Sequence, residues 1–224
     1  MISSGPRSGY LVVPEGLAAE RAAPAVLLLH SWWGLSPFFK RAADRLADAG
    51  FVTLVPDLHL GNRAETPDEA ESLLAEMDPN VVADLVVSSA SVLRGMPVTF
   101  DAPIGVVGFS MGASWGLWLA ARQPELVGAV SAWYGNQAID LVDARAAFQL
   151  HVAEHDELVA EDEYAFLEAA LRMDGHDVEA HRYPGTTHWF AEDDRVPAYD
   201  EGAAELAWER TVAFLSRTLV PGQA

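Results

Sequence analysis

A short glycine-flanked segment around Ser110 is the part of this chain best suited to covalent chemistry. Residues 108–112 read Gly-Phe-Ser-Met-Gly, an apolar run at 104–109 leads into them, and a small and apolar run at 113–121 follows. This pattern predicts a buried strand, a sharp turn and a helix, with the serine hydroxyl exposed at the turn. Glycines there remove Cβ atoms that would collide with neighbouring backbone. The pattern favours Ser110 as a nucleophile, and the alternative is a structural helix N-cap serine.

A serine hydroxyl needs a base to take its proton, and His188 is the histidine best placed to do so. In a fold with such a turn, the chain order is serine, acid, histidine, each on a loop after a strand. His188 lies in a turn-rich segment at 184–190, after the last predicted strand and before the last predicted helix. His30 ends the first buried strand and is expected to shape the oxyanion loop, whereas His151 is expected in the core. The remaining histidines are expected in loops or on exposed faces: His59, His155, His176 and His181.

The acid of such a triad should follow the preceding strand, which is predicted at 147–153. Three carboxylates compete there, namely Glu154, Asp156 and Glu157. Asp156 is the predicted partner because it lies a few residues beyond the strand, in the turn. It would accept the proton on Nδ1 of His188 and stabilise the imidazolium.

The tetrahedral oxyanion of acyl transfer needs two N–H donors that are already in place. The backbone N–H groups of Met111, directly after the nucleophile, and of Trp32, in the loop after the first buried strand, are predicted to supply them. Aromatic residues gather on the same predicted loops, where core packing is the alternative for about half of them. The predicted substrate-binding residues are Ser31, Trp33, Trp133, Tyr134 and Trp189.

The elements that must position these residues alternate between strands and helices. This alternation predicts an α/β class protein with a mainly parallel central sheet and helices on both faces, formed by one domain over residues 1–224. Strands are predicted at 10–13, 24–30, 51–55, 104–109, 126–134, 147–153 and 178–183. Helices are predicted at 36–50, 67–77, 80–93, 113–121 and 161–173, with a final helix that carries Ala204, Trp208, Val212, Leu215 and Leu219 on one face.

The composition of the chain limits the classes of binding partner that we expect. The formal net charge is −19, so the surface repels phosphate backbones and nucleic acid is not an expected partner. The chain has no cysteine, which excludes disulfides and thiolate metal sites. Residues 1–8 do not resemble a signal sequence and no apolar run reaches membrane-spanning length, so we expect a cytoplasmic protein without a membrane partner, either a monomer or a small homo-oligomer.

Five segments together resemble the dienelactone hydrolase family, within the α/β-hydrolase fold, from about Tyr10 to the C-terminus. They are residues 29–35 (LHSWWGL), 55–58 (VPDL), 108–113 (GFSMGA), 154–156 (EHD) and 185–190 (GTTHWF). The resemblance implies the roles already assigned to Ser110, Asp156 and His188, and it implies neither a metal nor a cofactor.

Two departures from the family pattern bear on the substrate. The founding type of the family carries cysteine at the place of Ser110 and, at the place of Ser31, a glutamate coupled to that cysteine; an ordinary serine needs no such partner. The founding type also binds a substrate carboxylate with arginines, one of them four residues after the catalytic histidine, where this chain has Glu192. We therefore expect Glu192 to repel carboxylates and neutral substrates to be preferred, unless Arg63 or Arg195 supplies a cation.

The sequence thus predicts a serine hydrolase that cleaves a small ester or lactone through an acyl-enzyme. Two alternatives remain open at this point. One keeps the same triad and changes the bond to an amide, peptide or thioester. The other is a non-catalytic, ligand-binding relative of the same fold.

Overall fold

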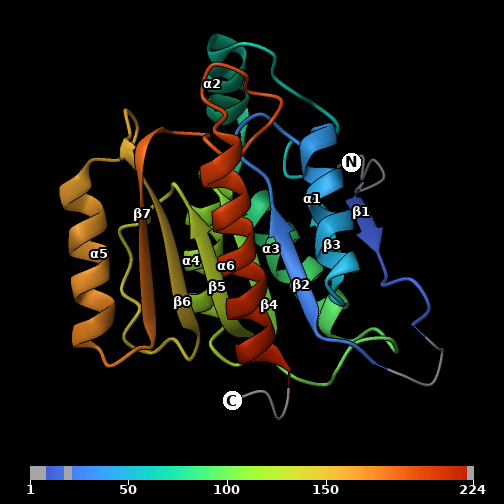
Figure 1. Ribbon diagram of the computed structural model, residues 1–224. Coiled ribbons are helices and arrows are strands. Elements are labelled where there is room, and N and C mark those ends of the chain that lie inside the picture. The colour runs from blue at the N-terminus through green and yellow to red at the C-terminus, as the bar shows by residue number, and fades with distance from the viewer. Residues whose placement is uncertain (1–8, 18–21, 221–224) are drawn as a thin grey trace.

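A seven-stranded sheet with helices on both faces makes up the part of the chain that the structure describes, residues 9–17 and 22–220 of a computed structural model (Figure 1). In chain order the elements are β1 (Gly9–Val12), β2 (Ala25–Leu29), α1 (Pro37–Asp48), β3 (Val52–Pro56), α2 (Pro67–Glu76), α3 (Pro79–Arg94), β4 (Ile104–Phe109), α4 (Met111–Arg122), β5 (Val127–Trp133), β6 (Ala147–His155), α5 (Glu161–Met173), β7 (Val178–Thr187) and α6 (Glu201–Leu219). The prediction of an absent signal sequence concerns residues 1–8, which lie outside the described residues. Within the described residues, every helix is too short or too polar to cross a membrane.

The strand order is β1-β3-β2-β4-β5-β6-β7, and every neighbouring pair is parallel except β1 and β3. The central strands β2 and β4 are buried along their whole length. Both faces of a parallel sheet must be covered, which explains why these strands are almost continuously apolar. The predicted α/β class with a mainly parallel central sheet is confirmed.

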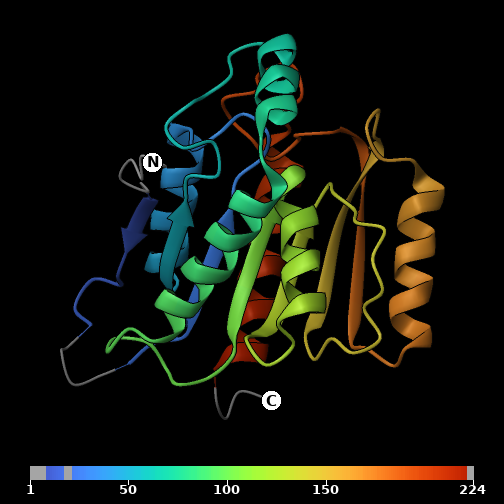
Figure 2. The same ribbon diagram turned by 180° about the vertical axis from the view of Figure 1, so that it is seen from behind.

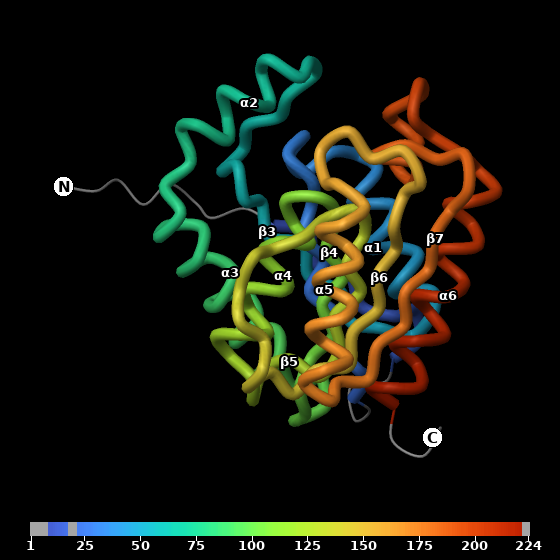
Figure 3. Tube along the Cα trace, turned by 90° about the vertical axis from the view of Figure 1, so that its left-hand side faces the viewer, coloured from blue at the N-terminus to red at the C-terminus, as the bar shows by residue number. Residues whose placement is uncertain are grey.

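Helices α1 and α6 cover one face of the sheet, and α3, α4 and α5 cover the other (Figures 2 and 3). Helix α4 lies close against β4, because a Cβ on its Gly116 would lie 3.0 Å from a methyl group of Val106. This close packing fixes the first turn of α4 directly above the end of β4. The nucleophile predicted from the sequence is the residue between these two elements.

The carboxyl ends of the parallel strands meet at one edge of the sheet, near α2 at the top of Figure 1. Ligand sites in open α/β sheets lie at this edge. The predicted site residues follow five different strands: residues 30–33 follow β2, Ser110 follows β4, Tyr134 follows β5, Asp156 follows β6 and His188 follows β7.

The last strand is longer than predicted. It continues through Pro184 and Gly185 to Thr187, and His155 pairs with Thr187 beyond a register shift. Proline is tolerated because β7 is an edge strand of the sheet. His188 is therefore held directly at the end of β7, as the first residue of a turn-rich loop that leads to α6.

Candidate active site

The backbone at Ser110 has a strained conformation, and close packing around the neighbouring glycines holds it there. Ser110 has φ 52° and ψ −115°, and its N–H donates to the carbonyl of Trp133 at 2.8 Å. A Cβ on Gly108 would lie 2.3 Å from the carbonyl oxygen of Gly112, and one on Gly112 would lie 2.2 Å from that of Leu29. Only glycine fits at these two positions, so residues 108–112 form a tight turn that we call the elbow.

The side chain of Ser110 does not cap the helix that it precedes. It makes no hydrogen bond to the first turn of α4, so the reading of Ser110 as a structural N-cap is wrong. Instead, its Oγ lies 2.8 Å from Nε2 of His188. Strain of this kind persists only where the surrounding structure imposes it, and it concentrates at functional sites.

A continuous hydrogen-bonded chain runs from Ser110 through His188 to Asp156. Nδ1 of His188 lies 2.8 Å and 2.9 Å from the two carboxylate oxygens of Asp156. An ionised carboxylate only accepts hydrogen bonds, so Nδ1 carries the proton and Nε2 is free to accept from the serine hydroxyl. The His188 side chain is 4% exposed, so it is shielded from bulk water.

Asp156 is held as an ionised acceptor by several donors. Its Oδ1 accepts from the N–H groups of Leu158 and Val159, and its Oδ2 accepts from the Tyr164 hydroxyl at 2.8 Å. Burial alone would raise the pKa of this carboxyl, but the hydrogen bond and charge interaction with His188, together with these donors, lower it below its usual value. The contribution of Tyr164, on the following helix, was not foreseen from the sequence.

The two neighbouring glutamates do not contact His188 in this way. The carboxylate of Glu154 accepts from the N–H of Gly185 at 2.7 Å and so ties the end of β6 to β7. Glu157 is exposed and lines a cavity beside His188. Of the three competing carboxylates, Asp156 is the one that lies against the imidazole.

The loop after β2 is held by two buried histidines. Nε2 of His30 accepts from the N–H of Leu58, so its Nδ1 carries the proton and donates to the carbonyl of Ser31 at 2.7 Å. Burial lowers the pKa of His30 to about 3, which keeps the ring neutral. Because N–H and C=O point in opposite directions in a trans peptide, this bond turns the N–H of Trp32 away from His30.

His59 holds the next peptide of the same loop. Its Nε2 lies 3.0 Å from the carbonyl of Trp32, and its ring is 5% exposed. His59 lies in the loop after β3, as expected, and its side chain is buried there. The other predicted oxyanion donor, the N–H of Met111, belongs to the first residue of α4, where backbone N–H groups have no acceptor within their own helix. Both oxyanion assignments stay predictions.

Ser31 and Tyr134 are joined by Glu192 beneath the site. The Ser31 hydroxyl donates to Oε2 of Glu192 at 2.9 Å, and the Tyr134 hydroxyl donates to Oε1 at 3.0 Å. Glu192 and Ser31 are fully buried, so the expectations that Glu192 repels a substrate carboxylate and that Ser31 contacts substrate are both wrong. The carboxyl instead ties the loops after β2, β5 and β7 together.

The buried position of Glu192 changes its acidity. Burial, with the negative charge of Asp194 as a second cause, raises the pKa of this carboxyl to about 8. The two hydroxyl donors and Arg195 lower it only in part. The ring of Tyr134 also meets that of His188 edge-on, with centroids 5.0 Å apart, so Glu192 is linked to the imidazole through one side chain.

The predicted aromatic residues divide between site and core. Trp33 and Trp189 line a cavity beside His188, and Trp189 stacks on Trp32 with centroids 5.5 Å apart. Trp133 lies on the other side of the sheet, stacked on Phe109 and packed against Trp208 of α6. The prediction that Trp133 binds substrate is therefore wrong, because its side chain is fully buried on the α6 face.

Two cavities meet at His188. The first, which we call the serine cavity, has a volume of about 430 Å³ and is lined by Ser110, Met111 and Tyr134 among others. The second, the aromatic cavity, has a volume of about 370 Å³ and is lined by Trp33 and Trp189. It also carries three carboxylates and one guanidinium, from Glu65, Glu157, Asp194 and Arg195. Arg195 lies over the ring of Trp33 at 4.0 Å.

Comparison with known proteins identifies the family. The model of the dienelactone hydrolase family matches residues 8–219. This chain belongs to the dienelactone hydrolase family. The resemblance inferred from the five sequence segments is confirmed, and the chain is accordingly related to hydrolases of lactones and esters.

Two sequence relatives match this chain over most of their own length, and a solved structure shows the same fold. The protein usf of Aquifex pyrophilus is 33% identical over 94% of this chain and 93% of its own length. Carboxymethylenebutenolidase 1 of Cupriavidus pinatubonensis is 27% identical over 95% of this chain and 93% of its own. The crystal structure of dienelactone hydrolase from Anabaena variabilis superposes with a TM-score of 0.71 at 24% identity, covering 98% of this chain and 95% of that one.

Proposed function

We propose that this chain is a serine hydrolase that cleaves carboxylic esters or lactones through an acyl-enzyme. The observation that carries the proposal is the hydrogen-bonded chain from Ser110 Oγ through His188 to Asp156, with the serine at a strained elbow. An imidazole that accepts from the serine at Nε2 and donates to a buried carboxylate from Nδ1 is arranged to remove the hydroxyl proton. Membership of the dienelactone hydrolase family supports the ester or lactone as the bond cleaved.

The geometry supports the following steps. Ser110 Oγ attacks the carbonyl carbon as His188 Nε2 takes its proton, and the N–H groups of Met111 and Trp32 bind the resulting oxyanion. The intermediate collapses, and the departing alkoxide takes the proton from His188; in a lactone the new hydroxyl stays on the acyl group. Water, deprotonated by His188, then attacks the acyl-enzyme and releases the acid and the free serine. Asp156 stabilises the imidazolium throughout.

Kinetics of Ser110→Ala test this proposal. With p-nitrophenyl acetate as a neutral substrate, kcat should fall by about 10⁴-fold or more. Ser91→Ala is a matched control, since Ser91 is exposed on α3, donates to the carbonyl of Val87 and lines neither cavity at His188. Near-wild-type turnover by a folded Ser110→Ala variant would contradict the proposed function.

A further inference from the structure

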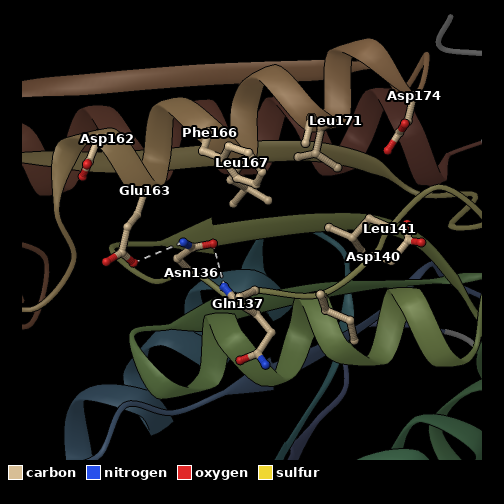
Figure 4. A pocket seen from close by; sticks show the side chains of 13 residues that line it. Asn136, Gln137, Asp140, Leu141, Asp162, Glu163, Phe166, Leu167, Leu171 and Asp174 are labelled. Atoms are coloured by element: carbon tan, nitrogen blue, oxygen red, sulfur yellow. Dashed lines mark hydrogen bonds between the residues drawn. The ribbon is translucent and has the colours of Figure 1, made fainter.

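A groove of about 1000 Å³ runs along α5 (Figure 4), and it adjoins the serine cavity through lining residues that the two have in common. One wall is the segment at 136–141 that follows β5, and the other is the face of α5 from Asp162 towards Asp174. We call this feature the α5 groove. The residues that line both the groove and the serine cavity are Asn136, Gln137, Ala138 and Glu163. The groove therefore lies next to the cavity that holds the Ser110 hydroxyl, in the direction in which a long substrate could extend.

The floor of the α5 groove is apolar. Leu167 and Leu171, one turn apart on α5, face Leu141 across it, and all three are buried (Figure 4). Phe166 also lines the groove, with 77% of its surface exposed. Such a lining favours hydrocarbon over polar groups.

The charges at the groove are all of one sign. Its lining includes the carboxylates of Asp140, Asp162, Glu163 and Asp174, and neither lysine nor arginine is among the described residues that form it. Glu163 accepts a long hydrogen bond of 3.4 Å from Asn136 where the groove meets the serine cavity, as Figure 4 shows. This bond is weak and opens at little cost. An uncharged chain meets no charge repulsion here, whereas an anionic one is repelled.

The reaction geometry assigns the two cavities to different parts of an ester. The leaving alcohol takes its proton from His188, and the aromatic cavity touches His188 but neither Ser110 nor Met111. The serine cavity touches the nucleophile and the predicted oxyanion donor, so the acyl group lies on that side. The α5 groove continues from the acyl side.

We infer that the α5 groove is an acyl-chain subsite, and that the substrates of this enzyme are neutral esters with an extended aliphatic acyl chain. The inference rests on the proposed function and specifies its substrate class. From Glu163 to Asp174 the helix rises about 16 Å, which sets the length of chain that can be accommodated. A methylene wholly removed from water contributes about fourfold, so an open groove should contribute about twofold per methylene.

A series of p-nitrophenyl esters from acetate through hexanoate to decanoate tests the subsite. The leaving group is constant, so kcat/KM should rise about 10²-fold from acetate to decanoate. The blocking variant is Ala170→Phe, because Ala170 lines the groove and is half-buried. It should remove the gain for decanoate and leave acetate turnover unchanged. Ala169→Phe is the matched control, since Ala169 is exposed on the same helix and does not line the groove.

The outcomes separate this inference from the proposed function. Two results would overturn the subsite alone, provided that acetate hydrolysis depends on Ser110. One is a kcat/KM that does not rise along the ester series, and the other is an equal effect of the two phenylalanine variants. Absence of Ser110-dependent hydrolysis across the series would overturn the proposed function. A decanoate-length ester ending in a carboxylate should lose the gain, and equal turnover of the charged and neutral chains would also count against the subsite. Urea unfolding of both variants establishes that they are folded.

Discussion

Replacing the buried Glu192 by glutamine should change how the stability of the protein depends on pH. Burial raises the pKa of this carboxyl to about 8 in the folded protein, whereas its ordinary value is 4.5. As pH rises above about 4.5, the unfolded chain therefore releases this proton while the folded protein retains it. The folded state binds more protons, so stability attributable to Glu192 falls as pH rises and stops falling at about pH 8.

The magnitude follows from the size of the shift. Each unit of pKa difference corresponds to about 1.4 kcal/mol, so the shift from 4.5 to about 8 costs at most about 5 kcal/mol of unfolding free energy at pH 8. Glutamine has almost the same shape and no proton to lose. Its amide can still accept from one hydroxyl and donate to the other, so the link between Ser31 and Tyr134 is retained.

Urea unfolding of the wild type and Glu192→Gln, from about pH 5 to about pH 8, measures this effect. As pH rises, the unfolding free energy of the wild type should fall relative to that of Glu192→Gln by about 1.4 kcal/mol per pH unit. Glu209→Gln, at an exposed position of α6, controls for the loss of one surface charge. A difference between wild type and Glu192→Gln that stays flat over this range would refute the reasoning, because Glu192 would then be ionised in the folded state.

Three further predictions concern the site and its surroundings. Asp156→Asn should lower kcat by roughly 10⁴-fold because it favours the wrong tautomer of His188, while Glu154→Gln should change kcat little. Steady-state kinetics of both variants measure this, and a larger loss of kcat in Glu154→Gln would contradict it. Gly112→Ala should cost about 3 kcal/mol of stability, since the new Cβ would lie 2.2 Å from the carbonyl oxygen of Leu29; an unchanged urea midpoint would show that the elbow can relax. A neutral ester should have a higher kcat/KM than a carboxylate-bearing ester of equal size, and the ratio should shrink with added salt if the net charge of −19 is the cause; faster turnover of the anionic ester would contradict this.

Local patterns were enough to predict most of the fold. The apolar run at 104–109 and the glycines around Ser110 define β4 and the elbow, and the structure has β4 at the predicted residues. Helix α5 also begins and ends where its sequence indicates, at Glu161 and Met173. These signals depend on residues a few positions apart, and the fixed order of loops along the sheet edge then brings Ser110, Asp156 and His188 together.

Contacts between distant residues could not be predicted in the same way. Ser31 and Glu192 lie 161 residues apart, and each was interpreted as a separate departure from the family pattern. The side chains of these two residues form one hydrogen bond with each other. The occurrence of both departures in one chain was the available sequence signal that the two residues are in contact. Trp133 was misplaced because alternation along β5 puts it on the α6 face with Ser131, to which its indole N–H donates.

The proposed covalent role of Ser110 is tested most directly by the mass of the protein after reaction with a fluorophosphonate. We predict that the intact mass rises by one phosphonyl group, that fragmentation of the peptide spanning 108–112 places the group on Ser110, and that Ser110→Ala gains no mass. Reaction should also slow sharply in Asp156→Asn, because the nucleophile depends on the oriented imidazole. Labelling of the Ser110→Ala variant at the wild-type rate, or an adduct on another residue, would contradict the central claim.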